Sequence, residues 1–409
     1  MPHLHTVEIS LMVRAGLRME TKENNGISHF LEHMLFRGNS RFPDSLSLNR
    51  EFETIGRDLR AATHSEYTSF GFSPHLSFLD RAVELLAEFF DEPTFPGLEL
   101  EREIILEECL EDLNDKGENI NINNLACQLL YEGDPLSWPT IGTEKTIQAI
   151  DTEMLKGYFE KFYNPGNSVL VGAGALQHDS FMELVHRHFG GWGRKGTVVT
   201  NEFFDLKEKQ EKSAVLFQED QDSQVQLQFC FRSRSYNHPD YFTLCLIGRI
   251  FDDGVCSRLQ RSLREDRGLV YSVECRATSW SDTGTFDFDV QVSPEKARQV
   301  LEILYKEIKL FVDEGPTEEE LAHVKNRYDF DLELDIDDPY KQIDRYGFPQ
   351  LYSSVMSVEE EQKCMRAVTL DDCKRVAGEI LIPESLNIVV VGPISKELKQ
   401  EVKKIADAF

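Results

Sequence analysis

The stretch of this 409-residue sequence with the clearest chemical potential is His-Phe-Leu-Glu-His, at residues 29–33. His29, Glu32 and His33 stand at positions i, i+3 and i+4, so a helix presents all three side chains on one face. Two neutral imidazoles one turn apart can bind a single ion, and tetrahedral zinc accepts such nitrogens. A catalytic zinc keeps one position for water, and Glu32 is then placed to act as general base on zinc-bound water.

A catalytic zinc needs a third protein ligand, and a helix predicted for residues 98–113 offers several carboxylates. Glu101 and Glu108 are seven residues apart, which places them two turns apart on one face, while two isoleucines between them point toward a core. Such a run of acidic residues is also typical of a solvated helix face. The pattern therefore indicates a wall of a metal site without deciding between Glu107 and Glu108.

The hydrophobic pattern predicts the elements that position these side chains, and it predicts a similar order twice. In the first half it predicts strands at residues 6–13, 66–73 and 167–175, and helices at 26–36, 46–55, 79–90 and 98–113. In the second half it predicts helices at 241–263 and 294–311, and strands at 284–292 and 386–392.

Two landmarks recur at nearly equal distances along the chain. Phe70 and Phe286 are 216 residues apart, and Gly172 and Gly392 are 220 residues apart, each pair closing or filling equivalent strands. This indicates an α+β fold with two duplicated domains, each a mostly antiparallel sheet packed with helices. The predicted boundaries are a zinc-binding domain at 1–190, a linker at 191–212 and a homologous domain at 213–409.

Composition excludes several classes of protein. The 44 basic and 72 acidic residues give a net charge of −28, which argues against nucleic acid and anionic membrane surfaces as partners. No apolar run is long enough for a transmembrane helix, and the N-terminus lacks a signal-peptide pattern. The eight cysteines are scattered, as is typical of reduced thiols. The sequence therefore predicts a cytoplasmic location.

The segments around these residues resemble a known enzyme family. Residues 26–38, GISHFLEHMLFRG, and residues 101–108, EREIILEE, are similar to the inverzincins. These inverted-motif zinc peptidases include insulin-degrading enzyme, pitrilysin and mitochondrial processing peptidase. The resemblance implies one Zn²⁺ per chain, with Glu108 as the third ligand; 74 residues lie between His33 and Glu108. It also implies that Glu101 orients the site from behind the ligands.

Residues 263–272, LREDRGLVYS, resemble a second feature of this family. Arg264 and Tyr271 match the pair that contacts the substrate and the tetrahedral intermediate: the Arg holds a carbonyl, and the Tyr donates to the developing oxyanion. In family members of this length, each subunit forms half of a clamshell around a closed chamber, and this pair reaches the zinc site of the opposing subunit. Because this chain carries both features, we expect a homodimer, while a heterodimer with a related subunit stays open.

One position departs from the family pattern. Residues 56–63 read GRDLRAAT, so Arg60 stands where the family usually has an Asn that holds the peptide backbone. An Arg can still bind a carbonyl, but it is longer and charged. If the strand at residues 67–73 is a sheet edge, an extended peptide can add to it as a further strand. We therefore expect Arg60, Ala61, Phe70 and Phe72 to contact the substrate.

These features together predict a zinc-dependent endopeptidase that hydrolyses short unfolded peptides in a closed chamber. A narrower version is a dedicated maturation peptidase for one precursor peptide. The alternative from another class is a catalytically weak binding or scaffold subunit of a heterodimeric peptidase, which the change at Arg60 favours and the intact zinc motif opposes.

Overall fold

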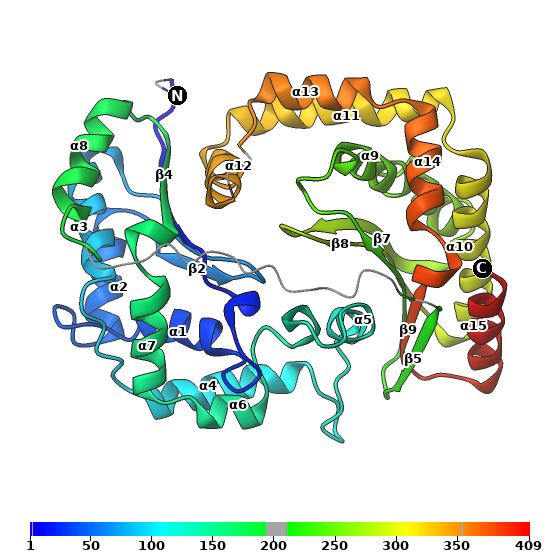
Figure 1. Ribbon diagram of the computed structural model, residues 1–409, viewed down its shortest axis with the longest axis horizontal. Coiled ribbons are helices and arrows are strands. Elements are labelled where there is room, and N and C mark those ends of the chain that lie inside the picture. The colour runs from blue at the N-terminus through cyan, green and yellow to red at the C-terminus, as the bar shows by residue number, and fades with distance from the viewer. Residues whose placement is uncertain (2, 194–209, 211, 353–354) are drawn as a thin grey trace. The chain divides into compact units, whose positions relative to one another are not determined.

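Residues 1, 3–193, 210, 212–352 and 355–409 are described by the computed structural model, which divides into two units (Figure 1). The first unit contains the residues up to Glu111, the segment that begins at Trp138 and ends before the undescribed stretch, and Glu333–Val355. The second contains Asp112–Ser137, the chain from the undescribed stretch to Leu332, and Met356–Phe409. Each unit therefore combines segments from both halves of the chain.

The sheet of the first unit has antiparallel strands in the order β2-β3-β1-β4. They are β1 (Val7–Val13), β2 (Arg60–Thr63), β3 (Thr68–Phe72) and β4 (Ser168–Gly174). Leu11 of β1 is in register with Phe70 of β3 and with Leu170 of β4. Because β2 pairs with β3 on its other side, residues 67–73 do not meet the condition of being a sheet edge, and the edge strand beside α1 is β2.

Helices of the first unit cover one face of this sheet. They are α1 (Ile27–Leu35), α2 (Ser45–Ile55), α3 (Leu79–Phe89), α4 (Leu98–Glu111), α6 (Glu144–Ala149), α7 (Thr152–Phe162) and α8 (His178–Phe189). Alternate residues of the strands point into this core, where Phe52 contacts Phe72 and Phe89 edge to face, with ring centroids 4.9 and 6.2 Å apart. Each such fully buried ring contributes about 1.5–3 kcal/mol to stability.

The other face of the same sheet is covered by α12 (Pro339–Leu351), a helix from the last fifth of the sequence. Ile343 and Leu351 of α12 pack on Met12 of β1. Gly347 faces the sheet so closely that a Cβ there would lie 2.7 Å from the sulfur of Met12. A glycine at this position therefore sets the close approach of α12 to the strands.

The sheet of the second unit has the order β5-β9-β6-β8-β7. Its strands are β5 (Ala214–Glu219), β6 (Val225–Ser233), β7 (Val270–Ser279), β8 (Gly284–Val292) and β9 (Asn387–Gly392). Only the β5–β9 pair is parallel among these pairings. The helices are α9 (Tyr241–Phe251), α10 (Pro294–Glu314), α11 (Glu318–Ile336), α13 (Val358–Ala367), α14 (Leu370–Ile380) and α15 (Lys396–Ala408).

One further helix of this unit, α5 (Ile122–Leu130), comes from the first half of the sequence. It packs on β6 and β9, where Leu125 and Leu130 meet Val389 and Val391. Short helical turns complete the chain at Leu17–Met19, Leu76–Phe78, Pro135–Ser137, Pro165–Asn167 and Pro383–Ser385, and a wider π-type turn covers Gln260–Glu265. The helix predicted at residues 241–263 is therefore interrupted after Phe251.

The predicted α+β fold with two antiparallel, helix-covered sheets is confirmed. Strands β2-β3-β1-β4 of the first unit correspond in order and direction to β7-β8-β6-β9 of the second. The units differ from the predicted continuous domains because α5 and α12 are exchanged between the two halves of the chain. Most of the predicted linker, at 194–209 and 211, lies outside the described residues.

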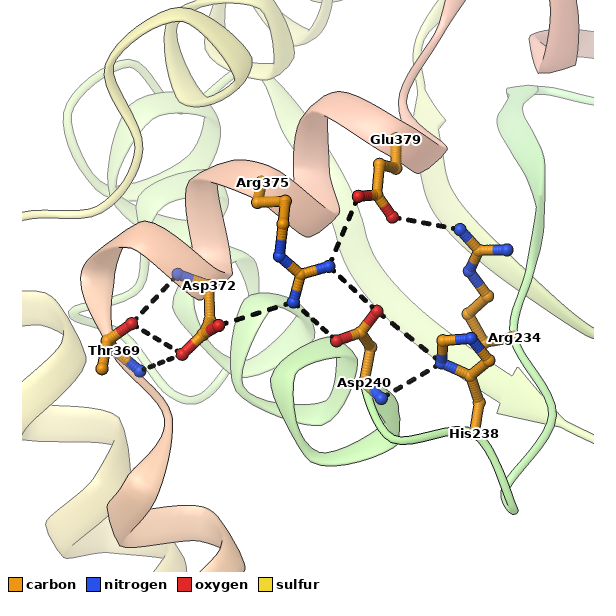
Figure 2. A network of polar contacts seen from close by, with 7 residues as sticks. All are labelled: Arg234, His238, Asp240, Thr369, Asp372, Arg375 and Glu379. Carbon is orange, nitrogen blue, oxygen red and sulfur yellow. Dashed lines mark hydrogen bonds and ion pairs between the residues drawn. The ribbon is translucent and has the colours of Figure 1, made fainter.

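A network of polar contacts holds the outer helices of the second unit together (Figure 2). Arg375 on α14 donates to both carboxylate oxygens of Asp240, just before α9, at 2.7 and 3.2 Å. Arg375 also contacts Glu379, which accepts from Arg234 at 3.1 Å. The network therefore adds charged contacts at the start of α9 to the apolar contacts that α9 and α14 make in the core.

The eight cysteines, all of which lie in described residues, form no disulfide bond with one another. Across the described parts of the chain, no helix combines the length and the apolar character that a membrane crossing requires.

Candidate metal centre

Helix α1 begins at a glycine with a left-handed backbone and at a buried carboxylate. Gly26 has φ +92°, and a Cβ there would lie 2.4 Å from the carbonyl oxygen of Ile141. Glu20 accepts hydrogen bonds from the backbone N–H groups of Gly26 at 2.7 Å and Ser28 at 3.0 Å. These are amides that a helix start leaves without partners, so Glu20 fixes the first turn of α1. Burial nonetheless raises the pKa of Glu20 to about 6.

The apolar residues of α1 fix which side faces the core. Ile27, Phe30, Leu31 and Met34 are buried. The opposite side carries His29, Glu32 and His33, which stay partly accessible. The helical face predicted from the spacing is therefore present.

Helix α4 supplies the acidic wall of the site. Its Ile105 is buried in the core, and Glu101, one turn earlier, is buried beside α1. Oε2 of Glu108 lies 3.6 Å from Nε2 of His29 and 3.7 Å from Nε2 of His33. Glu107 is exposed. Of the two glutamates that the sequence pattern left open, it is Glu108 that turns toward the histidines.

The donor atoms of His29, His33 and Glu108 all lie within 4.8 Å of one another, the one such group found in the described residues. The two Nε2 atoms are 3.2 Å apart. Three corners of a tetrahedral zinc site, with bonds of about 2.0–2.2 Å, are spaced by roughly 3.3–3.6 Å. The observed triangle of 3.2, 3.6 and 3.7 Å matches this spacing, so the donor set fits Zn²⁺ in both chemistry and size.

Glu101 determines which nitrogen of His33 faces the other donors. Its Oε1 lies 2.8 Å from Nδ1 of His33, and a carboxylate accepts, so Nδ1 carries the hydrogen and Nε2 keeps its lone pair. Burial alone would lower the pKa of His33, but its hydrogen bond to Glu101 and the charge of Glu108 raise it on balance. Burial and the neighbouring His33 lower the pKa of His29 to about 4, so the His29 imidazole is neutral near pH 7.

Glu32 is held by a residue that the sequence reasoning missed. The hydroxyl of Thr63, at the end of β2, donates to Oε2 of Glu32. Burial raises the pKa of Glu32, and the hydrogen bond from Thr63 opposes that shift. Thr63 is the last residue of the segment GRDLRAAT, which resembles the family pattern. No local sequence signal, however, links Thr63 to Glu32, which lies 31 positions earlier.

The residues expected to contact the substrate separate into two faces of the sheet. Phe70 and Phe72 are fully buried in the core, so their side chains are closed to a substrate, contrary to expectation. Ala61 shares the face of β2 that carries Thr63 and so points toward Glu32. Contact between Ala61 and the substrate therefore stays a prediction, and Ala61 lies on β2, which is an edge strand of the sheet.

Arg60 points to the opposite face of β2. Its guanidinium bonds to Glu8 of β1, whose side chain is 6% exposed, and lies 5.2 Å from the ring centre of Tyr340 on α12. Arg276 takes the corresponding position on β7, because Ala61 and Ala277 pair with Phe70 and Phe286, and it bonds to Asp289 at 2.8 Å. An arginine paired with a carboxylate thus occurs on the edge strand of both sheets, over the buried Glu8 in the first and over the partly buried Asp289 in the second, which favours a structural role over the expected substrate contact.

Arg264 and Tyr271 belong to the second unit. Arg264 lies in the wide turn Gln260–Glu265 and is exposed. Tyr271 lies on β7 and is 75% exposed. Both side chains are free to meet another molecule, and their roles stay predictions.

Two family models match the chain. The model described as Insulinase (Peptidase family M16) matches residues 1–144, and the model described as Peptidase M16 inactive domain matches residues 149–328. The first contains all three proposed zinc ligands and Glu32. The second covers much of the unit in which Arg264 and Tyr271 lie.

Relatives and solved structures agree with this match. The chain is 27% identical to the uncharacterized zinc protease YmxG of Bacillus subtilis (strain 168), over 96% of this chain and 94% of that protein. It is also 27% identical to mitochondrial-processing peptidase subunit beta of Bos taurus, over 96% and 81%. The structure of a protease from Helicobacter pylori has a similar fold, with a TM-score of 0.87 at 19% identity over 95% and 94% of the two chains.

Proposed function

The chain belongs to peptidase family M16, and from this premise we propose that it is a zinc-dependent endopeptidase acting on short, unfolded peptides. The observation that carries the proposal is the convergence of His29, His33 and Glu108 beside Glu32. Relatives named as zinc proteases support the choice of metal.

His29, His33 and Glu108 would hold the ion, one per chain. When bound, Zn²⁺ supplies Lewis-acid chemistry that polarises a peptide carbonyl and acidifies water. Glu101 would keep His33 in the tautomer that leaves Nε2 available.

Glu32 is proposed as the general base and then the general acid. Its carboxylate would take a proton from the attacking water and later deliver it to the leaving amide nitrogen. Thr63 would orient the carboxylate for both transfers, because its hydroxyl donates to one of the two oxygens. The raised pKa of Glu32 suits a group that must hold the proton between the two steps.

The edge strand β2 is the proposed binding element for the peptide. A free strand edge pairs with the backbone of an extended peptide whatever its side chains, which suits unfolded substrates. Because Thr63 of β2 contacts Glu32, a peptide paired with β2 would pass beside the general base.

Arg264 and Tyr271 are proposed to act on the substrate from a second chain. The guanidinium would hold a substrate carbonyl, and the phenol would donate to the developing oxyanion. A homodimer supplies these groups from an identical chain, and a heterodimer with a related subunit would supply them equally well.

The test is a paired measurement of zinc content and peptide cleavage on the wild-type chain and on Glu32→Gln. We expect about one zinc per chain in both, and a loss of cleavage of a quenched peptide mixture by about 10²–10⁴-fold in Glu32→Gln. Glu103→Gln is the matched control, because Glu103 is an exposed residue of α4, and it should leave both quantities unchanged.

The outcomes separate the proposed enzyme from its alternatives. Zinc binding without cleavage of the mixture would favour a scaffold subunit, or a maturation peptidase whose single precursor was absent. A wild-type chain that binds no zinc when metal is supplied would contradict the ligand assignment.

A further inference from the structure

Arg37 stands behind the candidate metal centre, two residues beyond the end of α1 and one helical turn past His33. Its Nε lies 3.5 Å from Oε2 of Glu101. The other oxygen of Glu101, Oε1, accepts from Nδ1 of His33 at 2.8 Å. The two oxygens of Glu101 thus face different partners, and a continuous line runs from Arg37 through Glu101 to His33.

The surroundings hold the guanidinium in this place. The side chain of Glu101 is 8% exposed and that of Arg37 is 27% exposed. The Nε of Arg37 is shielded from water and has no hydrogen-bond partner among the described residues, which leaves Glu101 as its charge partner. Gly97 leaves room on the other side, because a Cβ there would lie 3.2 Å from Nη2 of Arg37.

We propose that Arg37 is a positioning residue of the metal centre, which acts on His33 through Glu101. A buried carboxylate is costly unless a cation balances it. With Arg37 beside Oε2, Glu101 is held so that Oε1 accepts from Nδ1 of His33, and the lone pair of Nε2 is directed toward the other donors. Without Arg37, the same carboxylate is less well balanced and less well oriented, and the affinity for zinc falls.

This inference rests on the proposed zinc site, and its test therefore reads zinc affinity directly. Competition with a chromophoric chelator would be measured for wild type, Arg37→Met, Arg37→Gln and Arg37→Lys. We expect both neutral variants to bind Zn²⁺ about 10-fold more weakly, at the low end of what such supporting partners contribute. Arg37→Lys keeps the charge and should restore most of the loss.

Arg41→Met is the matched control. Arg41 lies in the same loop and pairs with Glu88, but that pair does not reach the histidines. Arg41→Met should leave zinc affinity unchanged, even if it lowers the stability of the fold as much as Arg37→Met does. Thermal unfolding of all variants would show that the compared proteins are folded.

A double-mutant cycle decides whether Arg37 acts through Glu101. In a Glu101→Gln background, Arg37→Met should cause no further loss of zinc affinity. Wild-type affinity in both neutral variants, or an equal loss with and without Glu101, would overturn the inference. Absence of peptide cleavage alongside the expected affinities would contradict the proposed function and leave the role of Arg37 supported.

Discussion

Helix α1 follows β1, which pairs with β3, and helix α9 follows β6, which pairs with β8, so the two helices occupy equivalent positions in the two units. Their polar residues nevertheless make different contacts. On α1, His29 and His33 direct donor atoms toward each other and toward Glu108 of the facing helix α4. On α9, the sequence YFTLCLIGRIF contains neither histidine nor carboxylate, and Arg249 is its charged residue. The duplicated fold alone therefore does not make a metal centre.

The second unit replaces the metal donors with an ion pair. Arg249 donates to Asp331 of α11 at 2.6 Å and to Asp253 at 3.1 Å, and it lies 4.8 Å from the ring centre of Tyr328. Two side chains of α11 thus contact Arg249 of α9, as Glu108 of α4 approaches the histidines of α1. In the second unit the charges neutralise each other, whereas in the first unit the donors fit an added cation. The two units therefore share the order and direction of four strands, while the chemistry at the equivalent helices depends on a few side chains.

The largest effect on zinc affinity should come from removing the proposed ligand Glu108, with a change on the corresponding helix of the second unit as the control. Glu108→Gln should weaken zinc binding by more than about 100-fold, because it removes a ligand and not merely a supporting group. Tyr328→Phe, on the corresponding helix of the second unit, should leave zinc affinity unchanged. Chelator competition on both variants checks this, and a similar loss in both would show that the two units are not independent.

A second comparison concerns the arginines on the edge strands. Arg60→Met leaves the buried Glu8 with Ser73 as its remaining hydrogen-bond donor, and Arg276→Met removes the ion-pair partner of the partly buried Asp289. We expect each change to lower the free energy of unfolding by about 1–3 kcal/mol, the usual cost of a buried polar group that loses its partner. Urea unfolding gives this quantity for both.

Peptide cleavage by Arg60→Met then distinguishes a structural role from substrate binding. With a structural role, the KM of the folded variant stays near that of wild type. A raised KM with unchanged stability would instead restore the expectation drawn from the family pattern, that this position holds the peptide.

The parts of the molecule that the sequence could predict are those with a local or family-specific pattern. His29, Glu32 and His33 share a helical face by spacing alone, and the alternating strands gave the antiparallel sheets. The choice of Glu108 over Glu107 needed the resemblance, because both fit a helix beside a core. Phe70 and Phe72 were misassigned because alternation shows that they share a face of the strand without showing that this face meets the helices of the core.

The rest depends on contacts between residues far apart in the chain. Thr63 reaches Glu32 across 31 positions, and Tyr340 meets Arg60 from a helix that the sequence order assigns to the other half. The exchange of α5 and α12 has the same cause: each sheet has a second face to cover, and an amphipathic helix carries no signal that says which sheet it covers. Glu20 differs from these cases, because an acidic residue shortly before a helix start is a local sequence signal for helix capping.

The smallest effect concerns the charged clusters on the outer helices, where both units use an aspartate with an arginine and a histidine. In the second unit Asp240, 13% exposed, is bound by Arg375, and in the first Asp80, 59% exposed, is bound by Arg187 and His188. Asp240→Asn should lower the free energy of unfolding by up to about 1 kcal/mol near pH 7, whereas Asp80→Asn should have no measurable effect.

The dependence on pH gives this last prediction its sign. The hydrogen bond from Arg375 lowers the pKa of Asp240 in the folded chain, so the contribution of Asp240 is present above the unfolded value of about 3.9 and is lost as the pH falls through the folded value below it. Urea midpoints of wild type and Asp240→Asn should therefore differ at pH 7 and converge below about pH 4. If the urea midpoints of wild type and Asp240→Asn still differed equally in acid, Asp240 would stabilise the start of α9 by packing and not by charge. The clusters around Asp240 and Asp80 would then differ in burial alone.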